Sequence, residues 1–125
     1  DAGEAYVYGI WQDLDFRGII DLHAIDLLNG GAQMGYWLKP AARGCGNVTQ
    51  SAAALLGISF EILRLERLEI RCAVGNQASA RIPLRLGFTE EALLVHAQRF
   101  GHGFKDLRLF RLLSSEYRAL LKPAA

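Results

Sequence analysis

The alternation of apolar and polar residues predicts three strands in the first third of the chain. Residues 5–12 and 17–25 are rich in aromatic and β-branched types, which favour strands. A third run of this kind, 33–38, follows a strong turn signal, Asn-Gly-Gly, at residues 29–31. Turns as short as these can join only antiparallel strands. We therefore expect the three runs to form an antiparallel meander.

The middle of the chain changes to the three- and four-residue spacing of a helix. Apolar residues recur at these steps between Val48 and Leu63 and give one apolar stripe that is suited to packing on a sheet. Residues 67–74 alternate again and predict a strand. The order strand, helix, strand implies a right-handed crossover and a parallel pair of strands.

The remainder predicts a second helix and two further strands. The helix is expected over residues 75–86, kinked or shortened by Pro83, which cannot donate a backbone hydrogen bond. Gly87 is expected to end it in a left-handed cap. The last strands, 91–100 and 105–113, are separated by a Gly-His-Gly hairpin turn, and the tail that follows them is expected to be frayed from Ser114 to Ala125.

Together these elements indicate an α/β (mixed α+β) fold, with one mixed, mostly antiparallel sheet of about six strands and two helices. A chain of 125 residues has the usual size of one domain, so we expect a single domain over residues 1–125. The 14 basic and 13 acidic residues nearly balance. The chain therefore does not have the excess of positive charge that is typical of proteins whose main partner is nucleic acid.

Composition also bears on location and on metals. The chain has no run of about 18–20 apolar residues that could span a membrane. Its acidic first residues do not resemble a secretory signal, so we expect a cytoplasmic protein. Cys45 and Cys72 have no metal or redox spacing and are expected to be free thiols in a reducing compartment. The three histidines are scattered, so no structural metal is expected.

Residues 36–49 contain a strand end, a glycine turn and a helix start. Gly44 and Gly46 carry no side chains, so backbone N–H groups there can converge on an anion. The helix start near Asn47 adds its positive end, and Arg43 adds a full charge. This combination suits a pyrophosphate, although a helix that merely begins after a glycine turn is the alternative. The segment lacks the third glycine of a dinucleotide fingerprint and the lysine of a P-loop.

Four motifs in order resemble the GNAT superfamily of N-acetyltransferases, and within it the ribosomal-protein-serine acetyltransferase branch. Gly35-Tyr-Trp-Leu38 followed by Arg43-Gly-Cys-Gly46 is similar to the family's pyrophosphate signature. Residues 73–88 are similar to its second signature, Asn-x-x-Ser followed by Arg-Leu-Gly-Phe. Residues 20–26 and 103–106 resemble the ribosomal branch. The resemblance covers the chain from residue 5 to roughly residue 115.

The resemblance implies transfer of an acetyl group from acetyl-CoA to a primary amine, by direct attack and without a covalent enzyme intermediate. A backbone N–H near Trp37 and Leu38, where the third strand splays from its neighbour, would polarise the carbonyl, with Leu38 favoured. Ser79 would act as the general acid toward the departing thiolate. The implied cofactor-binding residues are Trp37, Leu38, Arg43, Gly44, Cys45, Gly46, Asn47, Val48, Thr49, Asn76, Ser79 and Arg85.

Several of these residues also have structural readings. Asn76 would hold the pantetheine arm or a bridging water, and it is also a good helix N-cap. Ser79 can be an ordinary first-turn residue. Arg85 and its neighbour Arg81 would meet the nucleotide phosphate, although solvated charge is the default for both. His23 and His96 could act as bases by their intrinsic chemistry, but ordinary strand positions are favoured for both. Glu90 and Glu91 are the carboxylates nearest in sequence to the site, and a catalytic role is not favoured for them.

Two departures from the family pattern bear on activity. Ala41 stands where the signature has Gln or Arg, so one phosphate contact is missing. Gln33 stands where relatives often carry Glu, and an amide cannot take a proton. A peptide α-amine has a reference pKa of ~7.7–8.0 and is already partly neutral, whereas a lysine at ~10.4 needs more help from a base to lose its proton. The acceptor is therefore expected to be a protein N-terminus, such as that of a ribosomal protein, or a small amine.

The family usually carries a strand and two helices before the residue where this sequence begins. In the family these elements form one wall of the site that binds the acceptor. We therefore expect either an N-terminally truncated domain or a second subunit that supplies this wall. Two other functions stay open. One is a non-catalytic acyl-CoA-binding module, and the other is an interaction domain that dimerises through an exposed first strand.

Overall fold

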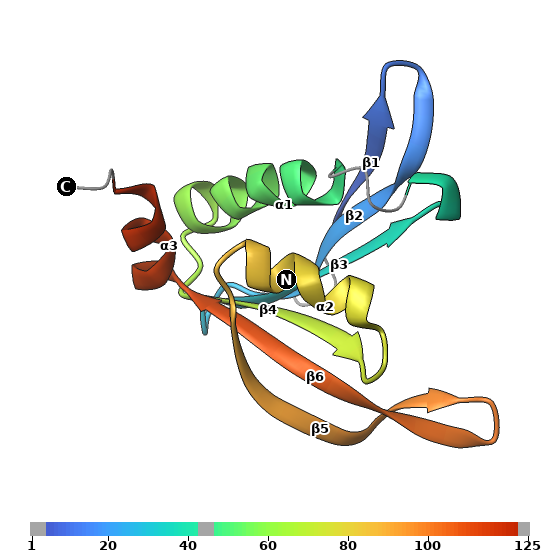
Figure 1. Ribbon diagram of the computed structural model, residues 1–125. Coiled ribbons are helices and arrows are strands. Elements are labelled where there is room, and N and C mark those ends of the chain that lie inside the picture. The colour runs from blue at the N-terminus through green and yellow to red at the C-terminus, as the bar shows by residue number, and fades with distance from the viewer. Residues whose placement is uncertain (1–4, 43–46, 123–125) are drawn as a thin grey trace.

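The computed structural model describes residues 5–42 and 47–122, which form one six-stranded sheet with helices packed on it (Figure 1). The strands are β1 (Tyr6–Gln12), β2 (Asp15–Asp26), β3 (Gly31–Leu38), β4 (Arg67–Ala73), β5 (Thr89–Phe100) and β6 (Gly103–Leu113). The helices are α1 (Asn47–Gly57), α2 (Gln77–Arg85) and α3 (Ser114–Leu121). A short 3₁₀ turn (Pro40–Ala42) follows β3, and a π-helical turn (Ile58–Ile62) follows α1.

The strand order is β1-β2-β3-β4-β6-β5. The meander β1–β2–β3 is antiparallel and β3 pairs with β4 in parallel, as predicted. β6 pairs antiparallel with both β4 and β5. The two hairpins, β1–β2 and β5–β6, extend away from the body of the molecule (Figure 1). The mixed, mostly antiparallel six-stranded sheet is thus confirmed.

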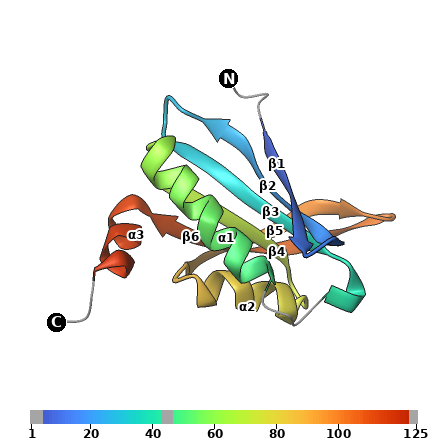
Figure 2. The ribbon, with the colours of Figure 1, turned by 90° about the horizontal axis from the view of Figure 1, so that it is seen from above.

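Helices α1 and α2 cover the same face of the sheet (Figure 2). Alternate residues of the central strands point into this layer, where Leu22, Leu68 and Phe110 are fully buried. They meet the apolar stripe of α1, which includes Val48 and Ala52. Each large apolar side chain buried in this way contributes about 1.5–3 kcal/mol to folding. The intervening residues of the same strands lie on the opposite face, which α1 and α2 do not cover.

The predicted helix from Val48 to Leu63 is not a single regular helix. It is α-helical to Gly57 and then widens into the π turn, where the Leu63 N–H donates to the Ile58 carbonyl at 2.9 Å. The buried Ser59 side chain donates to the Leu55 carbonyl at 2.8 Å. A side chain that occupies a backbone carbonyl of its own helix commonly bends the helix.

The tail is not frayed as expected, because its first eight residues form α3. The Leu113 N–H donates to the Glu116 carboxylate at 2.8 Å, which caps the start of the helix. Tyr117 stacks on Phe60 with ring centroids 4.9 Å apart, and its hydroxyl donates to Glu61 at 2.8 Å. These contacts dock α3 on the end of α1 and its π turn.

Of the helices described, none is long and apolar enough to cross a membrane. Within residues 5–42 and 47–122, no group of three or more His, Cys, Asp or Glu side chains is placed to hold a metal ion. Cys72 is a buried thiol without a disulfide, and Cys45 lies outside the described residues.

Candidate functional site

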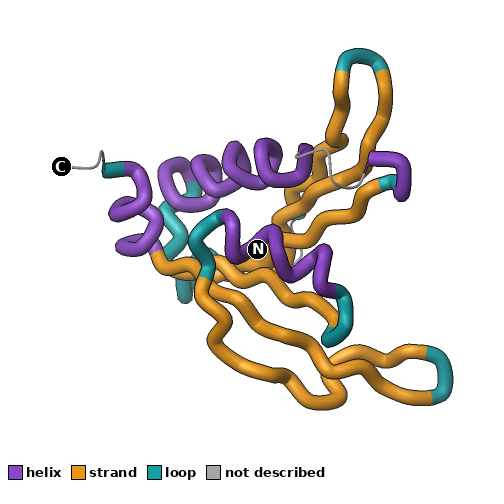
Figure 3. The backbone as a smooth tube through the Cα atoms, viewed as in Figure 1, coloured by secondary structure: helices purple, strands orange, loops and turns teal. Residues whose placement is uncertain are grey.

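The sheet opens between β3 and β4. The two strands pair only from Gly31 opposite Arg67 to Met34 opposite Ile70. Beyond this point β3 continues to Leu38 and β4 to Ala73 without pairing to each other, and they diverge (Figure 3). The splay that the resemblance implied near Trp37 and Leu38 therefore begins earlier, at Gly35.

The backbone of β3 presents polar groups to this gap. Lys39 donates its N–H to the Arg17 carbonyl of β2 at 2.8 Å. Backbone groups alternate along an antiparallel strand, so Trp37, two residues earlier, also directs its N–H toward β2. Tyr36 and Leu38 consequently face the gap. Of the two residues expected to supply an N–H, the geometry favours Leu38 and adds Tyr36.

A groove runs along the gap beneath α2. Its walls come from the end of β3 and from α2, and the residues are Tyr36, Trp37, Leu38, Asn76, Ala78, Ser79 and Ile82. It continues to the start of α1 through a second hollow that shares Leu38, Ala78 and Ile82 and adds Val48, Thr49, Arg81 and Arg85. Both arginines are exposed there, so the groove has a cationic end.

Most of the residues expected to bind the cofactor meet at this groove. Those that line it are Trp37, Leu38, Val48, Thr49, Asn76, Ser79 and Arg85. The predicted cradle of Arg43, Gly44, Cys45 and Gly46 lies outside the described residues. Asn47 is the first residue of α1, as predicted, but its side chain is not described.

Asn76 acts as the helix N-cap, which was the alternative to a role in cofactor binding. Its side-chain oxygen accepts the Ser79 N–H at 3.1 Å and caps the start of α2. The cap uses only the oxygen of the amide, and Asn76 still lines the groove. Capping and ligand contact are therefore compatible at this residue.

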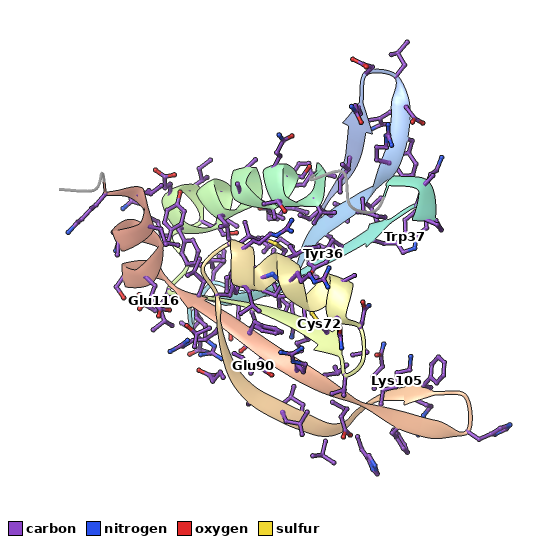
Figure 4. All side chains as sticks on the ribbon, in the orientation of Figure 1. Tyr36, Trp37, Cys72, Glu90, Lys105 and Glu116 are labelled. Carbon is purple, nitrogen blue, oxygen red and sulfur yellow. The ribbon has the colours of Figure 1, made fainter. Side chains whose placement is uncertain are left out.

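Tyr36 is a site residue that the sequence did not reveal. Its hydroxyl donates to the Ser79 carbonyl at 2.7 Å, and the Ser79 hydroxyl lies 3.4 Å from the Tyr36 oxygen. Burial raises the pKa of Tyr36 above its ordinary value. The hydroxyl also lies 4.0 Å from the Cys72 sulfur, and burial raises the pKa of that thiol too. Figure 4 labels Tyr36, Trp37 and Cys72 around this region.

Pro83 explains why the Ser79 carbonyl is available. In a regular helix that carbonyl would accept the N–H of the residue four positions later, which is Pro83 and has none. α2 nevertheless continues past the proline to Arg85, and Gly87 follows with a left-handed φ of 91°, as predicted. The Tyr36 hydroxyl takes the place of the missing backbone donor.

The open face of the sheet is polar beside the splay. On β2, the His23 Nδ1 lies 2.5 Å from the Asp21 carboxylate. On β4, Glu69 accepts from Arg67 at 2.9 Å and from Arg71 at 3.1 Å. Gln33, which stands where relatives often carry Glu, lies opposite His23 of this pair on the neighbouring strand.

The other titratable candidates lie on the outer strands. Arg108 holds the pKa of Glu90 below its usual range, and Arg67 does the same for Glu91. Both carboxylates are engaged in ion pairs. His96 lies in a bulge of β5, stacked on Phe104 at 5.6 Å. None of these three residues lines the groove.

Comparison with known proteins agrees with this geometry. Residues 1–89 match the family described as Acetyltransferase (GNAT) domain. The chain is 35% identical over 109 residues to the putative ribosomal N-acetyltransferase YdaF of Bacillus subtilis, covering 87% of this chain and 60% of that protein. It is 31% identical over 115 residues to the ribosomal-protein-serine acetyltransferase of Escherichia coli, covering 91% and 64%.

A solved structure titled as a probable acetyltransferase superposes on the chain with a TM-score of 0.86 at 34% identity. The match covers 90% of this chain and 63% of the other. The sequence thus spans 60% and 64% of the lengths of the two curated relatives.

Proposed function

Because the chain belongs to the GNAT family of acetyltransferases, we propose that it transfers an acetyl group from acetyl-CoA to a primary amine. The observation that carries the proposal is the groove along the β3–β4 splay, which leads from the start of α1 to Ser79 and Tyr36. We treat residues 1–125 as one acetyltransferase domain and place its activity in the cytoplasm, with acetyl-CoA and an amine as its partners.

The groove fits the chemistry of acetyl-CoA. The pantetheine arm carries amides, and the unpaired backbone of β3 at Tyr36 and Leu38 offers groups that can bond to them. Arg81 and Arg85 would meet the phosphates beside the positive end of α1. The predicted cradle at residues 43–46 would complete that phosphate site.

In the transfer step the neutral amine attacks the thioester carbonyl. A backbone N–H of Leu38 or Tyr36 would stabilise the oxyanion that forms. Placement of the two reactants in this groove can supply about 7–11 kcal/mol of the barrier. The Ser79 and Tyr36 hydroxyls would stabilise the departing thiolate. Because burial raises the pKa of Tyr36, its hydroxyl is suited to donating a hydrogen bond rather than to giving up its proton.

For the acceptor, we propose a protein α-amine, with a ribosomal protein N-terminus as the first candidate. The names of the two curated relatives support this choice. The acceptor would approach from the open face of the sheet, because α1 and α2 cover the other face (Figure 2). A second copy of the chain could add a wall to that side.

The experiment measures the release of CoA thiol from acetyl-CoA by the 125-residue chain. Three acceptors are compared: a peptide with a free α-amine, a lysine-containing peptide with a blocked N-terminus, and spermidine. The variant Ala78→Trp fills the groove, since Ala78 lines both of its parts. Ala53→Trp is the matched control, because Ala53 is an exposed alanine of α1 away from the groove. We expect turnover with the α-amine, kept in the control and lost in Ala78→Trp. Binding of acetyl-CoA without turnover of any amine would favour the non-catalytic alternative.

A further inference from the structure

Asp21 and His23 form a hydrogen-bonded pair on the open face of β2. The 2.5 Å contact joins the carboxylate oxygen to the imidazole Nδ1. A carboxylate can only accept, so Nδ1 carries the hydrogen and Nε2 of the neutral ring is left as a proton acceptor. Among the described residues, none makes a hydrogen bond with Nε2, and the His23 side chain is 44% exposed.

The pair reaches across the neighbouring strand toward the gap. Gly35 lies opposite Asp21 on β3 and is the first residue beyond the β3–β4 pairing. A Cβ placed on Gly35 would meet the Asp21 carboxylate oxygen at 3.1 Å and the His23 Cε1 at 3.3 Å. The two side chains therefore lie over the glycine, with Cε1, which is bonded to both ring nitrogens, directly above the strand that splays.

This position is on the far side of the sheet from α2 and one residue from Tyr36. Tyr36 bonds to Ser79 on the helix side, where the thioester sulfur is placed in the proposed reaction. An acetyl group in the gap would thus have Tyr36 and Ser79, which contact the thioester sulfur, on one face of the sheet. The His23–Asp21 pair would lie on the other face. An amine that attacks from the open face would pass this pair.

The other charged groups that face this region are already committed. On β4, Glu69 accepts hydrogen bonds from both Arg67 and Arg71. On β3 the neighbour of His23 is the uncharged Gln33, and on β1 the residue opposite Asp21 is Val7. The Asp26 carboxylate at the end of β2 lies on this face too, and it accepts hydrogen bonds from Asn29. Among the described residues of these strands, His23 is the imidazole on this face, and its Nε2 is the ring nitrogen left without a hydrogen bond.

We propose that His23 is the general base for the acetyl transfer and that Asp21 is the positioning residue that fixes its ring; this inference rests on the function proposed above. The amine nitrogen bonds to the carbonyl carbon, and its proton passes to Nε2 of His23, directly or through one water. The carbon–sulfur bond then breaks and the electron pair leaves on sulfur. The imidazolium returns the proton through solvent to the thiolate, so the products are the amide and CoA thiol.

The test measures kcat/KM against pH for the amine that the wild-type chain acetylates best, with acetyl-CoA binding measured separately. In the wild type the rate should fall at acid pH, as expected for a reaction that needs an unprotonated base. His23→Gln should lower kcat/KM by about 10²–10⁴-fold and remove the acid limb that His23 causes. Its affinity for acetyl-CoA should stay unchanged, because the groove is lined from the other face. His96→Gln is the matched control and should change neither rate nor profile.

Two further variants separate the base from the residue that positions it. Asp21→Asn should keep the acid limb while lowering the rate by roughly tenfold or more, since the ring loses the acceptor that fixes its tautomer. Gly35→Ala should also lower the rate with acetyl-CoA affinity retained, because its methyl group displaces both side chains.

A His23→Gln variant that keeps the acid limb and stays within about threefold of the wild-type kcat/KM would overturn the inference and leave the acetyl-transfer proposal intact. A wild-type chain that acetylates no amine would instead overturn the proposed function, and the assignment of His23 with it.

Discussion

The pairing of Tyr36 with Ser79 gives a sharp prediction about stability. Tyr36→Phe removes the hydroxyl that donates to the Ser79 carbonyl at 2.7 Å. No helical N–H can replace it, because the residue four positions later is Pro83. A partly buried carbonyl such as this one costs up to about 1–3 kcal/mol when it is left without a donor. We expect Tyr36→Phe to lower the free energy of unfolding by that amount.

The same reasoning predicts a rescue. Pro83→Ala supplies a backbone N–H to the Ser79 carbonyl, so the Tyr36 hydroxyl is no longer its only donor. In the Pro83→Ala background, Tyr36→Phe should therefore cost at least about 1 kcal/mol less than it costs alone. The four proteins of this double-mutant cycle give the coupling energy directly.

Urea unfolding measures the cycle. With an m value of about 1–3 kcal/mol/M, a loss of ~2 kcal/mol lowers the midpoint by about 1 M, which is well resolved. Tyr8→Phe on the exposed part of β1 is the control, and it should change the free energy of unfolding by no more than about 0.5 kcal/mol. Effects of Tyr36→Phe and Pro83→Ala that add within about 0.3–0.5 kcal/mol would refute the idea that the two residues serve one carbonyl.

Three further predictions follow from the same structure. The raised pKa of Tyr36 means that the unfolded chain loses this proton first, so stability should fall as pH rises above about 10, and less steeply in Tyr36→Phe; equal slopes in alkaline unfolding would contradict this. Alanine at both Arg81 and Arg85 should weaken acetyl-CoA binding by about three- to tenfold at low salt and less at high salt, and a salt-independent loss would argue against a phosphate contact. Gly87→Ala should cost about 1–3 kcal/mol, because φ is +91° and the new Cβ would lie 2.6 Å from a Leu120 methyl; an unchanged melting temperature would contradict both the backbone strain and the clash.

The strands were predictable because local signals decide them. The glycine-rich turns at residues 29–31 and 101–103 and the alternation around them place every strand within a few residues of its observed bounds. α3 was missed because it docks through Tyr117 on Phe60, which lies far away in sequence. The one local signal was Glu116, whose carboxylate caps the helix start.

The groove was predictable as a set of residues, but its chemistry was not. Pro83 was interpreted only as an obstacle to the helix, whereas its missing N–H frees the Ser79 carbonyl for Tyr36, 43 residues earlier than Ser79. No local pattern connects these positions. The sequence does predict that Asp21 and His23 lie on the same face of the sheet, because they are two residues apart in one strand. Only the structure shows that they lie over Gly35, beside the gap.

A calorimetric titration of the 125-residue chain with acetyl-CoA, repeated with Ala78→Trp and Ala53→Trp, tests directly whether the groove between β3 and α2 binds the cofactor. We predict saturable one-to-one binding that Ala53→Trp retains and Ala78→Trp loses, because of these two alanines only Ala78 lines the groove. Absence of binding by the folded wild-type chain, or equal binding by both tryptophan variants, would contradict it.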